Sequence, residues 1–130
     1  MRKVLVVGGN GFIGSHLVDK IVGKQWDVSV LDEFPRKFSE LPACVKFIQT
    51  DFDHSIAKIE RIVAETKPDV VFHLAWKTLP ETSIKNPIGD IGINLIPTLN
   101  LISTCAKTKI RLVFVGKHFI GKFIEYLCNL

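Results

Sequence analysis

The chain has 130 residues, enough for one domain with a buried core, and its 47% hydrophobic and 23% charged residues exclude a disordered polypeptide. The net charge of +4 comes from scattered lysines and arginines without interleaved aromatic residues, so we expect no nucleic-acid binding. No apolar run reaches about 18 residues and no signal peptide is visible, so we expect no membrane span and a cytoplasmic protein.

The cysteines and histidines show no pattern that would bind a metal. The three cysteines are odd in number and widely spaced, which favours reduced thiols, and none forms a C-x-x-C pair. The four histidines lack metal-ligand spacing with one another or with the cysteines, so we expect no metal site. The residues concerned are Cys44, Cys105, Cys128, His16, His54, His73 and His118.

The first predicted elements are a buried strand over residues 3–7 and a helix over residues 12–23, joined by a glycine-rich turn. The glycines Gly8, Gly11 and Gly14 have the spacing G-x-x-G-x-x-G. In order, they would allow a tight turn, a close approach of a phosphate to the backbone, and close packing of helix against strand. Free N–H groups of the first helical turn then point at negative charge. This junction predicts a site for the diphosphate of a dinucleotide.

The second predicted strand, residues 28–31, is followed by an acid. Asp32 lies close to the spacing of about 20 residues expected for a carboxylate that accepts hydrogen bonds from an adenosine ribose. Its charge would repel a 2′-phosphate, which favours NAD over NADP. Arg36 leaves NADP open, because an arginine at this place could pair with such a phosphate. In the alternative interpretation, Asp32 only caps a turn and Arg36 is solvated.

The rest of the chain continues to alternate strands and helices. A predicted helix over residues 55–67 has Ile56, Ile59, Ile62 and Val63 on one face, and Pro68 ends it. The other predicted elements are a loop over 35–42, a short strand over 45–49, a strand over 69–74, a mostly helical stretch over 87–107 that Pro97 interrupts, a strand over 111–115 and a last helix over 119–130.

Apolar strands that alternate with helices predict an α/β protein with a parallel sheet covered on both faces. Right-handed crossovers then give a doubly wound, Rossmann-type sheet of about five strands in the order 3-2-1-4-5. Its ligand crevice lies at the carboxyl ends of the strands, at the switch between the first and fourth strands. The glycine turn, Asp32, Asp51 and residues 73–76 all fall at this edge.

These residues resemble the extended short-chain dehydrogenase/reductase family, specifically its NAD-dependent nucleotide-sugar epimerases and dehydratases. Residues 8–14 match the G-G-x-G-F-I-G of that family, and residues 51–52 match its acid-plus-apolar pair after the third strand. Residues 73–75 match its H-L-A-A signature, residues 94–101 its N-x-x-G-T-x-N-L helix, and residues 112–115 its fifth strand. The similarity covers residues 1 to about 121.

The resemblance implies a role for each matched position. The glycine turn would hold the pyrophosphate, and Asp32 would hold the adenosine ribose. Asp51 and Phe52 would bracket the adenine, with the carboxylate accepting from its amino group. The nicotinamide half would run past the residues after the fourth strand, and Asn94 would lie on the helix beneath the active site. The implied cofactor-binding residues are Gly8, Gly11, Phe12, Ile13, Gly14, Asp32, Asp51, Phe52, Leu74, Ala75, Trp76 and Asn94.

Three departures from the family pattern bear on catalysis. Val115-Gly116-Lys117 stands where the family has a serine or threonine after the fifth strand, and Pro97 replaces a small glycine. The Y-x-x-x-K pair is missing, since the only tyrosine is Tyr126 and residue 130 is leucine. We therefore expect no catalytic residue here. We interpret residues 1–130 as one dinucleotide-binding domain, truncated so that the substrate domain of the family is absent.

Some side chains keep two interpretations at this stage. Trp76 could stack on a cofactor ring or cover the core. Lys117 and His118 could reach the site or lie in a solvated loop. His73 is expected to have a structural role, such as orienting a loop by hydrogen bonding.

The leading function hypothesis is the NAD-binding portion of a nucleotide-sugar epimerase or dehydratase, with little or no turnover and with a nucleotide sugar bound only in full-length relatives. The alternatives are a non-catalytic NAD(P)-binding sensor or scaffold and a small NAD(P)H-dependent reductase. The apolar residues Ile93, Ile96, Leu99 and Leu101 would leave a helix face open for a homodimer.

Overall fold

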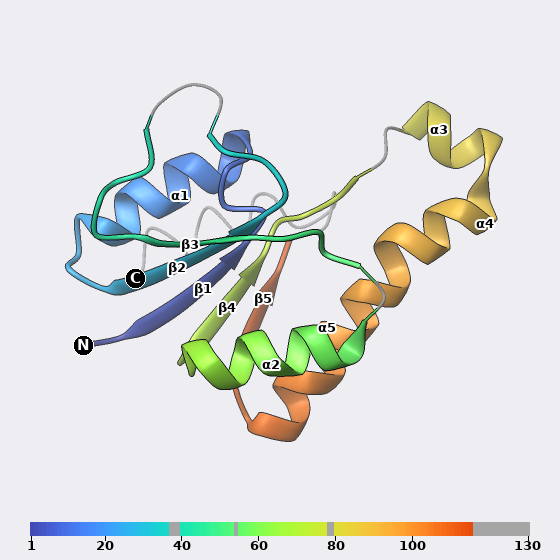
Figure 1. The fold of residues 1–130 in the computed structure, drawn as a ribbon. Helices are drawn as coiled ribbons and strands as arrows, with labels where there is room; N and C mark the ends of the chain where they lie inside the picture. The colour runs from blue at the N-terminus through green and yellow to red at the C-terminus, as the bar shows by residue number, and fades with distance from the viewer. Residues whose placement is uncertain (37–39, 54, 78–79, 116–130) are drawn as a thin grey trace.

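The computed structural model describes residues 1–36, 40–53, 55–77 and 80–115, and the helix expected over residues 119–130 lies outside them. Five parallel strands form one sheet in the order β3-β2-β1-β4-β5, which confirms the predicted α/β fold (Figure 1). The strands are β1 (Lys3–Val7), β2 (Asp27–Asp32), β3 (Lys46–Gln49), β4 (Val70–His73) and β5 (Arg111–Phe114). The helical segments are α1 (Phe12–Val22), α2 (Ile56–Thr66), α3 (Pro80–Lys85), α4 (Pro87–Asp90), the π-helix η1 (Ile91–Leu95) and α5 (Ile96–Thr108).

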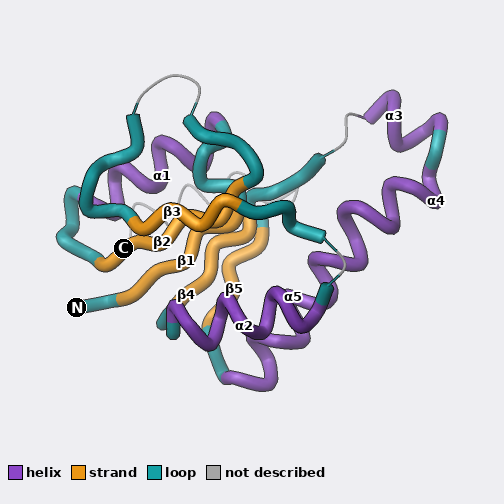
Figure 2. The backbone as a smooth tube through the Cα atoms, in the orientation of Figure 1, coloured by secondary structure: helices purple, strands orange, loops and turns teal. Residues whose placement is uncertain are grey.

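Helices cover both faces of the sheet, with α1 on one face and α2 and α5 on the other (Figures 1 and 2). Successive strand residues point to opposite faces, so Val6 of β1 packs in the cluster with Leu17 of α1. Val7 packs in the opposite cluster with Ile62 of α2 and Leu101 of α5. Burial of each such side chain contributes about 1.5–3 kcal/mol, so the two apolar layers hold the strand ends in a fixed arrangement.

The predicted helix over residues 55–67 forms with its expected ends. The Oγ of Ser55 accepts a hydrogen bond from the Lys58 N–H at 3.3 Å, which caps the start of α2. Lys67 closes the helix in the left-handed conformation with φ of 45°, directly before Pro68. The buried stripe on α2 begins at Ile59, and Ile56 in the first turn remains 39% exposed, contrary to its assignment to the apolar face.

Pro97 does not interrupt the long helical stretch, which corrects the prediction. The preceding segment η1 widens to π-type hydrogen bonding, in which the Ile96 N–H donates to the Ile91 carbonyl. Pro97 then lies at the start of α5, where a missing backbone N–H and a fixed φ are tolerated. The short helix α3 was not predicted from the sequence.

The register of the sheet brings the strand ends to one edge. Val7 at the end of β1 lies opposite Leu31 of β2 and His73 of β4. Backbone hydrogen bonds continue past these pairs, because the Gly8 N–H donates to the Leu31 carbonyl at 2.8 Å and the Leu74 N–H donates to the Val7 carbonyl at 2.8 Å. The segments that follow β1, β2 and β4 are therefore neighbours at the carboxyl edge.

Candidate functional site

A cavity of about 620 Å³ opens at the carboxyl edge of the sheet. It lies at the position where β1 is flanked by β2 on one side and β4 on the other, as expected for the switch point of a doubly wound sheet. Eight residues that were singled out from the sequence line it: Gly8, Gly11, Phe12, Asp32, Phe52, Leu74, Ala75 and Trp76.

The glycine turn is shaped by two contacts that only glycine allows. Gly8 has a φ of +82°, and a Cβ built there would lie 2.7 Å from the backbone nitrogen of Ala75. A Cβ on Gly14 would lie 2.2 Å from the carbonyl oxygen of Gly8, so this glycine lets α1 pack directly on the turn. Gly14 is buried and Ile13 is 46% exposed, and neither lines the cavity.

The start of α1 has no side-chain cap. Gly11 is the N-cap residue and provides no side-chain hydrogen bond, and no acid occurs in the first turn of the helix. The first N–H groups of a helix have no partner within it and carry partial positive charge. Phe12, the first residue of α1, lines the cavity, so the start of this helix lies at the cavity wall. Helix starts of this kind can bind anions.

Asp32 is held in place by two backbone donors. Its Oδ2 accepts from the Asn10 N–H at 2.9 Å, and its Oδ1 accepts from the Phe34 N–H at 3.2 Å. The carboxylate therefore caps the turn after β2 and lines the cavity at the same time, so capping does not remove it from the cavity. A carboxylate can accept about four hydrogen bonds. The two backbone hydrogen bonds therefore leave Asp32 able to accept from a further donor.

Arg36 is neither solvated nor part of the cavity wall. Its side chain is only 3% exposed, and its Nη1 pairs with the Oδ1 of Asp19 on α1 at 2.9 Å. Its Nη2 also donates to the Ser15 carbonyl at 3.0 Å. The guanidinium is thus bound to the α1 side of the loop, so the solvated interpretation is wrong.

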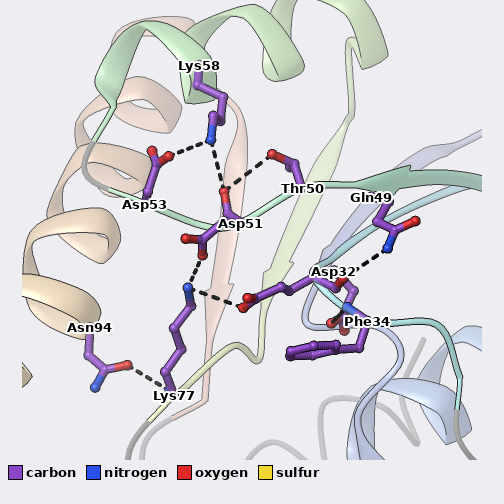
Figure 3. Close-up of polar contacts among 10 residues, drawn as sticks. Asp32, Phe34, Gln49, Thr50, Asp51, Asp53, Lys58, Lys77 and Asn94 are labelled. Carbon is purple, nitrogen blue, oxygen red and sulfur yellow. Dashed lines mark hydrogen bonds and ion pairs between the residues drawn. The ribbon is translucent and has the colours of Figure 1, made fainter.

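The residues after β3 divide between the cavity and its rim. Phe52 is 7% exposed and lines the cavity. Asp51 has a half-exposed side chain and does not line the cavity; its Oδ1 pairs with the Nζ of Lys77 (Figure 3). The same Nζ lies 3.5 Å from the Oε2 of Glu33, which does line the cavity.

The segment after β4 lines the cavity and is held by a hydrogen bond to η1. Trp76 is 52% exposed at the cavity, which excludes the interpretation that it covers the core. Asn94 of η1 is 4% exposed, and its Oδ1 accepts from the Lys77 N–H at 2.8 Å (Figure 3). Its Nδ2 donates to the Oδ1 of Asp90 at 2.8 Å. Asn94 therefore supports the segment without lining the cavity.

His73 has the structural contacts expected of a core residue. It is 1% exposed, and its Nε2 lies 2.8 Å from the Oγ1 of Thr98, whose hydroxyl donates to the Asn94 carbonyl at 2.7 Å. Because that hydroxyl proton is used, we assign the proton of the ring to Nε2. Burial lowers the pKa of His73 to about 4, so the imidazole is neutral at pH 7.

Several residues that line the cavity were not predicted from the sequence as site residues. Asn10 lines the cavity and its Nδ2 donates to the Phe34 carbonyl at 2.8 Å, which joins the glycine turn to the loop after β2. Glu33, Phe34 and Lys77 also line it. Each of these side chains belongs to a segment that leaves a strand at the carboxyl edge, so the rule that placed Asp32 there could have included them.

Within the described part of the chain, no group of three His, Cys, Asp or Glu side chains could hold a metal ion. The same residues contain no helix with the length and apolar character needed to cross a bilayer. Cys44 is exposed and Cys105 is buried, and both are free thiols. Burial raises the pKa of the Cys105 thiol to about 11, which makes it unreactive at neutral pH.

The sheet order and a glycine turn at its switch point define the Rossmann-like class of α/β proteins. The chain belongs to the NAD-dependent epimerase/dehydratase family, because the model of that family matches residues 4–123. The UDP-glucose 4-epimerase of Mycoplasma pneumoniae is 34% identical over 103 residues, covering 77% of this chain and 30% of that protein. The UDP-glucuronic acid decarboxylase 1 of Arabidopsis thaliana is 32% identical over 117 residues, covering 88% and 26%.

Solved structures give the same family. The UDP-glucose 4-epimerase of Thermus thermophilus in complex with NAD has a TM-score of 0.76 and 36% identity, covering 88% of this chain and 37% of that one. The UDP-glucose 4-epimerase of Thermotoga maritima with UDP-glucose has a TM-score of 0.75 and 33% identity, covering 85% and 36%. The chain thus spans about a third of the length of the relatives it matches.

Proposed function

We propose that residues 1–130 form one cytoplasmic dinucleotide-binding domain that binds NAD in the cavity at the carboxyl edge. The observation that carries this proposal is that the Gly8 turn, the uncapped start of α1 and the carboxylate of Asp32 border the same cavity. These groups supply donors for a diphosphate and an acceptor for ribose hydroxyls. The complex of the Thermus thermophilus relative with NAD supports the choice of cofactor.

We give the other predicted residues the roles that the family resemblance implies. Phe52 packs against the adenine and Asp51 accepts from its amino group, while Leu74, Ala75 and Trp76 border the nicotinamide half. Two of the predicted residues act indirectly. Gly14 shapes the turn by allowing α1 to approach it, and Asn94 holds the segment that carries Trp76.

The site favours NAD over NADP for two reasons. The charge of Asp32 would repel a 2′-phosphate, and its oxygens are fixed at the cavity by backbone donors. The arginine that could have paired with that phosphate is bound to Asp19 and to the Ser15 carbonyl instead. Recognition of a 2′-phosphate would first require these contacts to break.

Calorimetric titration of the folded chain with NAD and with NADP tests the proposal. We expect NAD to bind, and Asp32→Ala to weaken its binding about 10- to 100-fold, because hydrogen bonds to a charged group are lost. Asp27→Ala, which removes an acid at the opposite end of β2, is the matched control and should leave NAD affinity unchanged. Absence of NAD binding by the folded wild-type chain would refute the proposal.

We further propose that binding serves the chemistry of nucleotide-sugar epimerases and dehydratases, but that residues 1–130 alone turn over little or no substrate. When bound, NAD supplies the hydride acceptor for oxidation of a sugar hydroxyl. The proton of that hydroxyl then needs a base, and the only tyrosine in these residues, Tyr126, lacks a lysine four positions on. Loss of such a group costs about 10²–10⁴ in rate. Epimerisation of UDP-glucose at ordinary enzyme rates of about 10 s⁻¹ would contradict this.

A second candidate function is a non-catalytic module that binds a protein partner or a second copy. Its support is a group of exposed apolar side chains on α3 to α5, formed by Ile84, Ile88, Ile93, Ile96 and Leu99, which are 39–82% exposed. We propose that these residues mediate a homodimer. Leu101, which was assigned to this surface from the sequence, is 1% exposed and packs in the core, so that assignment is wrong.

A further inference from the structure

Lys77 connects the ends of three strands at one side of the cavity. It follows β4, and its Nζ pairs with the carboxylate of Asp51 after β3 (Figure 3). The same Nζ lies 3.5 Å from the Glu33 carboxylate after β2. Lys77 and Glu33 both line the cavity. A residue of the cavity wall therefore pairs with the acid that we propose accepts from the amino group of adenine.

The backbone that carries this ammonium group is held by a buried side chain. The Lys77 N–H donates to the buried Asn94 side chain at 2.8 Å, and Asn94 in turn donates to Asp90. The Lys77 side chain is 29% exposed, less than the carboxylates of Asp51 and Glu33, which are 49% and 42% exposed. Lys77 is thus a partly desolvated and paired charge on a held backbone segment, and not a free surface lysine.

The neighbouring lysine has a different set of partners. Lys58 of α2 pairs with the Oδ2 of Asp53 at 2.5 Å, and its Nζ donates to the main-chain carbonyl of Asp51 at 3.3 Å (Figure 3). It therefore contacts the backbone of Asp51, whereas Lys77 contacts the carboxylate itself. Substitution of either lysine removes one positive charge from this region, but only substitution of Lys77 removes a contact to the Asp51 carboxylate. Comparison of the two variants therefore separates these effects.

We propose that Lys77 determines how strongly the site discriminates between an amino group and a carbonyl oxygen at position 6 of the purine. This inference rests on the proposed NAD site. A carboxylate only accepts hydrogen bonds, so Asp51 alone favours the amino group of adenine and repels a carbonyl. An ammonium group only donates, so Lys77 competes with adenine for Asp51 and offers a donor to a carbonyl oxygen. With both residues present, the site accepts adenine and hypoxanthine with little preference.

The test compares NAD with its hypoxanthine analogue by calorimetry in the wild-type chain, Lys77→Met, Lys58→Met and Asp51→Ala/Lys77→Met. We expect the two ligands to bind the wild-type chain within about threefold of each other, and Lys77→Met to raise the preference for NAD about tenfold or more. Lys58→Met should keep the wild-type ratio, and the double variant should lose the gain, because the effect passes through Asp51.

An unchanged or lower preference for NAD in Lys77→Met would overturn the inference, as would an equal rise in Lys58→Met. Circular dichroism and thermal unfolding establish that each variant is folded. Lys77→Gln removes the charge with less change in polarity, and it is judged by the same ratio where Lys77→Met does not fold. Failure of the wild-type chain to bind NAD refutes the proposed function, whereas NAD binding with an unchanged ratio refutes only the role of Lys77.

Discussion

The buried imidazole of His73 makes the stability of the fold depend on pH. Its ring packs between Phe52 and Phe114, with centroids 5.1 and 5.5 Å away, and its Nδ1 has no hydrogen-bond partner among the described residues. Because burial lowers the pKa from 6.5 to about 4, the unfolded chain binds the proton more readily than the folded chain between these values. The contribution of the neutral His73 to the free energy of unfolding is complete above pH 6.5 and is lost as the pH falls towards 4.

Urea denaturation at pH 7 and at about pH 4.5 measures this effect. We expect the free energy of unfolding to fall by about 2–3 kcal/mol from His73 alone, and His73→Gln to show a correspondingly shallower dependence on pH. His16→Gln, which removes an exposed histidine of α1, is the control for the loss of any histidine. Equal dependence on pH in wild type and His73→Gln would show that this ring does not carry the effect.

At the scale of elements, the contact between α1 and the glycine turn couples stability to the candidate site. Gly14→Ala places a Cβ 2.2 Å from the Gly8 carbonyl oxygen and 2.8 Å from the Gly9 Cα, so the helix or the turn must move. We expect a loss of about 1–3 kcal/mol in the free energy of unfolding, together with weaker NAD binding.

The same helix offers a matched control for this substitution. Gly23 at the end of α1 has a φ of −59°, and a Cβ there would meet its nearest atom, the Lys20 carbonyl oxygen, at 3.5 Å. Gly23→Ala should therefore be neutral or raise the free energy of unfolding by up to about 1 kcal/mol. Thermal unfolding and NAD titration of both variants check the prediction, and equal effects of the two would argue against a specific role of the contact at Gly14.

The helices and strands that were predicted correctly are those whose formation depends on nearby residues in the sequence. The strand order follows from buried apolar runs such as residues 3–7, whose burial on both faces leaves few other arrangements. The prediction that Pro97 interrupts the helix was wrong. Whether a helix tolerates a proline depends on the hydrogen-bond spacing of the turn before it, and the periodicity of the sequence does not show that spacing. The helix α3 is short, so it carries little of the amphipathic pattern that reveals longer helices.

The candidate site shows the same limit at the level of side chains. Asp32 was placed correctly at the edge because a strand end fixes its backbone. The pairing of Arg36 with Asp19, and of Lys77 with Asp51, joins residues on different elements through flexible side chains. Such contacts depend on the exact path of each loop, and an arginine or lysine has several acids within reach of any one path. The sequence therefore predicts the cavity better than the charges around it.

At the scale of the whole molecule, α3, α4 and the start of α5 extend away from the sheet (Figure 1). The exposed apolar side chains of these helices include Ile88 at 82% and Leu99 at 52%. Removal of such area from water contributes about 25 cal/mol per Å², which favours association of two copies. We therefore expect the chain to sediment as a dimer or larger species at about 100 μM, a concentration at which weak association is visible.

The variant Ile88→Lys/Leu99→Lys should sediment as a monomer with an unchanged circular dichroism spectrum, because both side chains are exposed in the fold. Ile56→Lys on α2, where the side chain is 39% exposed, is the matched control and should sediment like the wild-type chain. A monomeric wild-type chain at this concentration would contradict self-association through α3 to α5. Dissociation by Ile56→Lys would instead place the interface on α2.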